Sequence, residues 1–142
     1  MKLGFYPGCS LQGTAREYNE SVKALAPVFD IELVDIEDWN CCGASAAHAV
    51  NKNLSLALPA RILALAEQQG FNEIVVPCAA CFNRLAVAQY EMNKDAELKQ
   101  QTEKAIDMTF DNKVRILNVV QFIDKYIKDK IADKLSHKFE HQ

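Results

Sequence analysis

Residues 72–85 read NEIVVPCAACFNRL, and this stretch indicates both the fold class and the position of the candidate functional site. The apolar run 74–76, closed by a proline, predicts a short strand that is buried on both faces. The residues from Ala79 to about Met92 have the apolar spacing of a helix. Cys78 and Cys81 therefore stand where a strand ends and a helix begins.

The same order of strand and helix repeats along the chain. The apolar runs predict strands over residues 2–6, 31–36, 72–77 and 114–117. Helical spacing predicts helices over residues 14–29, 43–70 (kinked or restarted at Pro59), 79–92, 96–108 and from 118 to about 131. This alternation predicts an α/β fold with a mainly parallel sheet of about four strands and helices on both faces.

Caps and apolar stripes support three of these helices. Thr14 with Glu17, and Asn118 with Gln121, have the spacing of capping boxes. The stripes expected to face the core are Ala15, Tyr18, Val22, Leu25 and Phe29 in the first helix; Phe82, Leu85, Ala86 and Tyr90 in the helix after Cys78; and Val120, Ile123, Ile127 and Ile131 in the last.

Length and composition limit the function classes. The chain has 142 residues, of which 49% are apolar and 25% charged, so it is long enough for one domain with a real core. We expect a single domain over 1–135 and a loose tail over 136–142. The net charge of −3 argues against a nucleic-acid partner. No apolar run is long enough to span a bilayer and no signal peptide is apparent, so we expect a soluble, cytoplasmic protein.

The five cysteines fall at the ends of the predicted strands. Cys9 follows the first strand, Cys41 and Cys42 follow the second, and Cys78 and Cys81 follow the third. An odd number excludes complete internal pairing, and in a reducing compartment such a set is typical of metal binding or catalysis. Because parallel strands end at the same edge of a sheet, we expect the sulfurs to meet at the carboxyl edge.

Several kinds of site use thiols in this pattern. A Cys-x-x-Cys unit opening a helix occurs in thioredoxin-like pairs, zinc sites and iron–sulfur sites, and the positive end of the helix favours thiolate there. The adjacent Cys41-Cys42 pair suits a polynuclear centre reached by a bent loop, in which Gly43 lets the backbone come close or take a positive φ. Five thiols exceed the four ligands of zinc or of an ordinary iron–sulfur cluster. The pattern favours iron–sulfur, with zinc and a metal-free dithiol switch as alternatives.

The sequence motifs around the cysteines resemble those of the CCG cysteine-rich domain found in the family of heterodisulfide reductase B subunits. The resemblance covers about residues 1–130. Its motifs are FYPGCSLQGTAREY at 5–18, DWNCCGAS at 38–45, LALPAR at 56–61 and VPCAACFNRL at 76–85.

The resemblance implies a function and a set of ligands. In that family each CCG module holds a non-cubane [4Fe–4S] cluster through five cysteines, which match Cys9, Cys41, Cys42, Cys78 and Cys81 here. Two modules together cleave a small-molecule disulfide, the coenzyme M–coenzyme B heterodisulfide in methanogens, with electrons from an iron–sulfur partner subunit. The resemblance thus implies an oxidoreductase acting on sulfur groups.

This chain departs from that pattern because it has one CCG set. The resemblance therefore implies a second CCG half as a partner, and it implies that this single module does not cleave the disulfide alone. An exposed apolar face, on the last helix, is expected where that half or another partner packs. The alternatives are a CCG electron-transfer or docking module of a glycolate, lactate, glycerol-3-phosphate or succinate dehydrogenase, and a zinc-stabilised module without enzymatic activity.

Four other residues near the motifs have two interpretations each. His48 is a candidate proton donor to a leaving thiolate, or an ordinary surface or core histidine. Trp39 is expected to pack the cysteine loop and shield the centre, rather than to stack on a substrate. Arg61 and Arg84 either steer an anionic substrate or lie exposed on helices.

Overall fold

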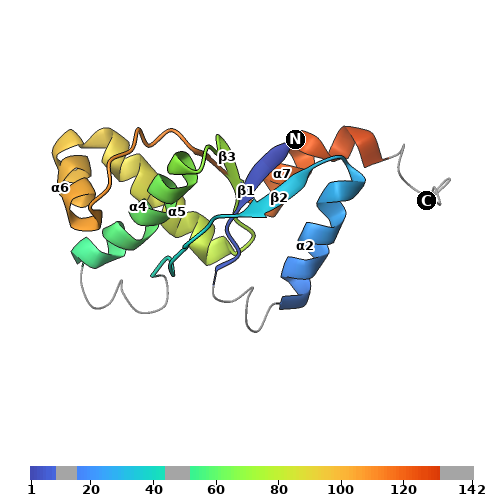
Figure 1. The fold of residues 1–142 in the computed structure, drawn as a ribbon, viewed down its shortest axis with the longest axis horizontal. Helices are drawn as coiled ribbons and strands as arrows, with labels where there is room; N and C mark the ends of the chain where they lie inside the picture. The colour runs from blue at the N-terminus through green and yellow to red at the C-terminus, as the bar shows by residue number, and fades with distance from the viewer. Residues whose placement is uncertain (9–15, 44–51, 132–142) are drawn as a thin grey trace.

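The computed structural model describes residues 1–8, 16–43 and 52–131, with backbone only for 52–55 (Figure 1). Its strands are β1 (Lys2–Phe5), β2 (Glu32–Asp35), β3 (Glu73–Val75) and β4 (Arg115–Leu117). Its helices are α2 (Arg16–Val28), α4 (Lys52–Gln68), α5 (Ala79–Lys94), α6 (Ala96–Ile106), α7 (Val119–Tyr126) and the 3₁₀ turn η1 (Lys128–Lys130).

The strands form one parallel sheet in the order β2-β1-β3-β4. The α/β fold with a parallel four-stranded sheet is therefore confirmed. After β1 the chain first adds a strand on one side and later adds β3 on the other. The order thus reverses between β1 and β3, and in open α/β sheets this reversal leaves a crevice beyond the carboxyl ends of the strands.

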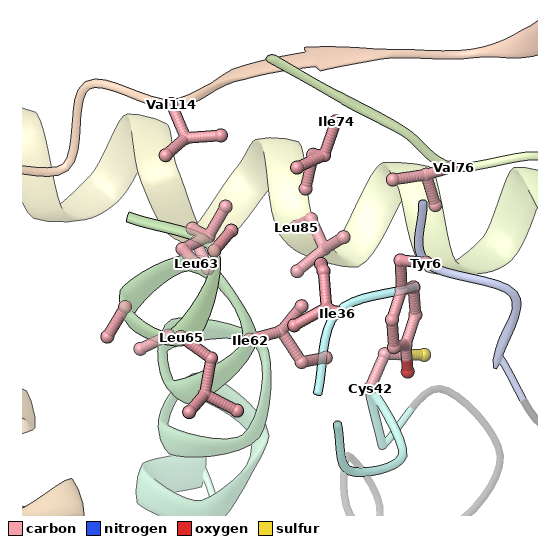
Figure 2. Packing of buried hydrophobic residues seen from close by; sticks show 14 of the residues in the cluster. Tyr6, Ile36, Cys42, Ile62, Leu63, Leu65, Ile74, Val76, Leu85 and Val114 are labelled. Carbon is pink, nitrogen blue, oxygen red and sulfur yellow. The ribbon is translucent and has the colours of Figure 1, made fainter. Parts of the chain in front are cut away.

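Each face of the sheet has its own core, as the alternation of side chains along a strand requires. One face packs against α2 and α7, on the right in Figure 1, and its buried residues include Phe5, Val75 and Phe122. The other packs against α4 and α5, and its buried residues include Tyr6 and Ile74 (Figure 2). Helices on both faces were expected, and the structure confirms them.

The helices bury faces that match the predicted stripes only in part. Tyr18 and Leu25 of α2, Tyr90 of α5, and Val120 and Ile131 of the last helical stretch are all exposed, Val120 by 75%. Val22, Leu85 and Ile127 of the predicted stripes are buried as expected, and Ala26, Ala88, Met92 and Phe122, which lie outside the stripes, are buried as well. The predicted stripes were wrong at those five exposed positions because the way each helix is rotated against the sheet selects the buried side.

The predicted boundaries were accurate where the local chemistry is strong. Asn118 caps α7 in a capping box with Gln121, as expected. Pro59 does not restart the helix, since α4 continues through it. The Thr14 cap lies outside the described residues, as do residues 44–51 of the predicted long helix and the tail 136–142. No helix in the described ranges has both the length and the apolar character needed to cross a membrane.

The end of the sheet away from the cysteines carries a polar anchor for α7. Glu73, the first residue of β3, accepts hydrogen bonds from the Lys125 ammonium and the Tyr126 hydroxyl. Burial opposes ionisation of Glu73, but the hydrogen bonds from both partners and the Lys125 charge outweigh it and lower the pKa of the carboxyl. Glu73 therefore anchors α7 to the sheet in its ionised form.

Candidate functional site

Cys78 and Cys81 lie at the carboxyl end of β3, beside the reversal in strand order. Cys78 follows β3 closely and is the N-cap of α5, with extended backbone and no side-chain capping bond. Its carbonyl accepts the first helical bond, from the amide of Phe82 at 2.8 Å. The pair thus stands at the junction that the sequence predicted, with Cys78 half-buried and Cys81 buried.

Cys42 reaches the same place from the loop after β2. Its Sγ lies 3.1 Å from the Sγ of Cys81, within a sulfur hydrogen bond. The two side chains are only 2% and 6% exposed. Figure 2 shows Cys42 at the same end of the buried cluster as Tyr6. The structure therefore brings together thiols from two of the three predicted segments.

Cys81 is not the thiolate that a helix N-terminus was expected to favour. The hydrogen bond to Cys42, burial, and the nearby thiols of Cys42 and Cys78 together raise the pKa of the Cys81 thiol far above its ordinary value. Ionising one of several crowded thiols places a charge beside sulfurs that offer no compensating positive charge.

Cys41 and Cys42, which were expected to reach one centre from a bent loop, differ in their burial. Cys41 is exposed while Cys42 is buried. Gly43 has a φ of +82°, which confirms the predicted positive φ. Its amide donates to the Sγ of Cys41 at 3.3 Å. The loop therefore presents one sulfur to the interior and one to the surface.

Gly8 brings the backbone that precedes Cys9 against the sulfur of Cys81. It is buried, has a φ of +75°, and a Cβ added to it would lie 3.1 Å from the Sγ of Cys81. Cys9 and His48 themselves lie outside the described residues. The sequence interpretation gave Gly8 no role, and it missed that this glycine gives the backbone room beside a thiol.

The loop before Cys41 is held by side chains from two other elements. The Tyr6 hydroxyl donates to the Asn40 carbonyl at 2.7 Å, and the Tyr6 ring meets Trp39 edge-on at 5.5 Å between centroids. Trp39 thus packs the loop onto the core, as expected. Arg61 of α4 donates to Asp38 and Asn40. Arg61 is thereby engaged by the loop, a role that the sequence interpretation did not consider.

The donor set suits a metal centre of soft-ligand type. Within the described ranges, no three His, Cys, Asp or Glu side chains are arranged to hold a single metal ion. Cys42 and Cys81 are buried in contact with each other and Cys78 lies half-buried near Cys81, and thiolates are the ligands that iron–sulfur clusters and zinc prefer. The soft thiol donors of Cys42, Cys78 and Cys81 therefore fit a thiolate-ligated metal group.

Comparisons with known proteins give relatives of two kinds. The chain is 41% identical over 96 residues to the 8-methylmenaquinol:fumarate reductase membrane anchor subunit of Wolinella succinogenes, a match that covers 68% of this chain and 34% of that protein. It is 27% identical over 128 residues to the B subunit of the ferredoxin/F420H2-dependent CoB-CoM heterodisulfide reductase of Methanosarcina acetivorans, covering 87% of this chain and 42% of that protein. The chain thus spans less than half the length of these curated relatives.

A solved structure supports the fold. A hypothetical protein from Helicobacter pylori superposes with a TM-score of 0.75 over 89% of this chain and 26% of its own, at 12% sequence identity. The family described as the CCG cysteine-rich domain matches residues 3–86, which include all five cysteines. This chain belongs to the CCG cysteine-rich domain family.

Proposed function

We propose that this chain is an iron–sulfur electron-transfer module of a multi-subunit reductase. The observation that carries the proposal is the contact between Cys42 and Cys81, which joins the loop after β2 to the junction after β3 in a buried cluster of thiols. The homologues are named as subunits of reductases, and this supports an oxidoreductase with partner subunits.

The proposed ligands are Cys9, Cys41, Cys42, Cys78 and Cys81, and the proposed group is a non-cubane [4Fe–4S] cluster. When bound, such a cluster supplies one-electron redox chemistry. The chain's own contribution is to gather thiols at the carboxyl edge of the sheet and to exclude water from Cys42 and Cys81. We propose a cytoplasmic location because free thiols persist in a reducing compartment.

For the whole protein we propose reduction of a small-molecule disulfide, with a second CCG module and an iron–sulfur subunit as partners. The support is the match to a heterodisulfide reductase B subunit, which covers 87% of this chain. A second candidate is an electron-transfer module of a quinol-linked fumarate reductase, which the higher identity to the Wolinella protein favours. In either complex, apolar surface such as Val120 is available for packing.

Anaerobic reconstitution tests the cofactor. The purified chain is incubated with iron and sulfide, and in a parallel sample with zinc, and is then desalted and assayed for bound metal and acid-labile sulfide. We expect iron and sulfide in near-equal amounts, with absorption near 400 nm and an electron paramagnetic resonance signal after oxidation or reduction. Zinc binding without iron uptake would contradict the proposal and favour a zinc-stabilised module.

The substrate is tested in the assembled complex. Reduced complex is mixed with the coenzyme M–coenzyme B heterodisulfide or with fumarate, and reoxidation of the cluster is followed spectroscopically. Reoxidation by the heterodisulfide alone supports the first candidate, and reoxidation by fumarate alone supports the second. The single module is expected to be reduced by a viologen dye without turning over the heterodisulfide.

A further inference from the structure

Asn40 connects the cysteine loop to two other parts of the fold. Its side-chain Nδ2 donates to the carbonyl of Cys41 at 2.9 Å and to the carbonyl of Leu58, on α4, at 3.0 Å. Its own carbonyl accepts from the hydroxyl of Tyr6, just after β1, at 2.7 Å. The residue immediately before the cysteine pair is thus fixed from both sides.

Arg61 completes this connection one helical turn after Leu58. One guanidinium nitrogen donates to the Asp38 carbonyl and to the Asn40 Oδ1, each at 2.9 Å. The other donates to the Asp38 carboxylate at 2.6 Å. A planar guanidinium can make these three bonds at once because its donors are held in a fixed fork, which the single ammonium of a lysine cannot reproduce.

The backbone that Arg61 holds has an unusual conformation. Asp38 has a φ of +60°, a left-handed conformation that costs free energy for a residue with a side chain. Its carbonyl and its carboxylate both accept from Arg61, so these bonds offset part of that cost. None of the bonds described for Arg61 and Asn40 involves a sulfur atom. The loop therefore has a means of keeping its shape that does not depend on ligation.

We propose that Arg61 and Asn40 are positioning residues that hold the loop so that the Cys42 thiol lies against Cys81. The expected effect of these residues on the cluster rests on the proposed function. Their effect on the loop is expected in the chain without metal, and the two effects are measured separately.

The variant Arg61→Lys tests the loop in the metal-free chain. The native chain is treated anaerobically with iodoacetamide, and the labelling rates of Cys41 and Cys42 are measured by peptide mass spectrometry. We expect Cys42 to be labelled roughly tenfold faster in the variant, because losing charge-assisted hydrogen bonds shifts local opening by that order. The labelling rate of exposed Cys41 should change little. Arg115→Lys, at the opposite end of the sheet, is the matched control and should label like the original chain.

The loaded protein gives a readout that a purely structural role would not change. We expect Arg61→Lys to shift the cluster's paramagnetic resonance spectrum and midpoint potential, while Arg115→Lys leaves both unchanged. Equal Cys42 labelling in the two variants, together with identical spectra, would overturn the proposal. Should Arg61→Lys fail to fold, Asp38→Asn removes the negative charge of one partner, which weakens its hydrogen bond to Arg61, and should speed Cys42 labelling by a smaller factor. No change in that variant would also overturn the proposal.

The two proposals fail in different ways. If the original chain takes up no iron, the proposed cofactor is wrong, and the labelling comparison still decides whether Arg61 positions the loop. If the chain takes up iron but the labelling and spectra of the two variants agree, the cofactor stands and the positioning role fails.

Discussion

The Sγ atoms of Cys42 and Cys81 lie 3.1 Å apart although the two residues are separated by 39 positions in the chain. They meet because β2 and β3 flank β1 in a parallel sheet, so the loops after them open at the same edge. The contact places two thiols that the chain delivers independently into one buried cluster.

Replacing a proposed ligand should reduce cluster binding. We expect Cys42→Ser and Cys9→Ser each to lower iron per chain by roughly half or more, because a hydroxyl is a poor substitute for a thiolate ligand. Iron and sulfide analysis after anaerobic reconstitution measures the effect. His48→Ala is the control and should retain the iron content of the original chain. Full iron in both serine variants would argue against ligation by five cysteines.

The metal-free chain should form a disulfide between Cys42 and Cys81 when it is oxidised. Their sulfurs are already in contact, whereas Cys41 points to the surface. Mild treatment with diamide, followed by peptide mapping under non-reducing conditions, identifies the pairing. We expect the Cys42–Cys81 peptide to be the first intrachain product. A dominant Cys78–Cys81 product would show that the loop after β2 moves away from α5 in the absence of metal.

Gly8→Ala should be more damaging than an equivalent change elsewhere. Gly8 and Gly70 both have positive φ, but a Cβ at Gly8 meets the Cys81 sulfur at 3.1 Å while a Cβ at Gly70 meets nothing within 4 Å. The backbone cost alone, about 1 kcal/mol, should appear in both variants. Urea unfolding should show an additional loss for Gly8→Ala, and only this variant should bind less iron. Equal effects of the two substitutions would contradict the importance of the sulfur contact.

The Glu73 anchor should make stability depend on pH in the acid range. The pKa of Glu73 is lower in the folded chain than in the unfolded chain, where a glutamate has a pKa of about 4.3. As the pH falls below that value, the unfolded chain binds more protons than the folded chain. The stability that ionised Glu73 contributes is therefore lost as the pH falls through its pKa in the folded chain. Glu73→Gln should therefore lower the free energy of unfolding at pH 7 by about 1 kcal/mol. The difference from the original chain should shrink towards pH 3.

Urea unfolding at several pH values measures this dependence. Glu32→Gln is the control, since Glu32 forms an exposed pair with Lys2 at 4.0 Å and its loss should matter by only a few tenths of a kcal/mol. If the difference in the free energy of unfolding between Glu73→Gln and the original chain stays constant from pH 7 to pH 3, the anchor is not the source of the pH dependence.

The sequence predicted the candidate site well where its signals are local. An apolar run closed by a proline places Cys78 at a strand end, and Gly43 after two cysteines indicates a bend with positive φ. The roles of Arg61 and Gly8 could not be read in this way. Arg61 binds a loop that lies 23 positions earlier, and Gly8 contacts a sulfur in α5, so neither contact leaves a pattern in its own segment.

The pattern of apolar runs, caps and cysteines by itself determined the α/β class, the parallel direction of the strands and the segments that carry thiols, because these depend on interactions between near neighbours in the chain. Only the tertiary structure decided the strand order, which side of each helix is buried, and which sulfurs touch. These depend on the packing of distant segments, and that packing leaves Cys41 at the surface, buries Cys42 against Cys81, and raises the pKa of the Cys81 thiol.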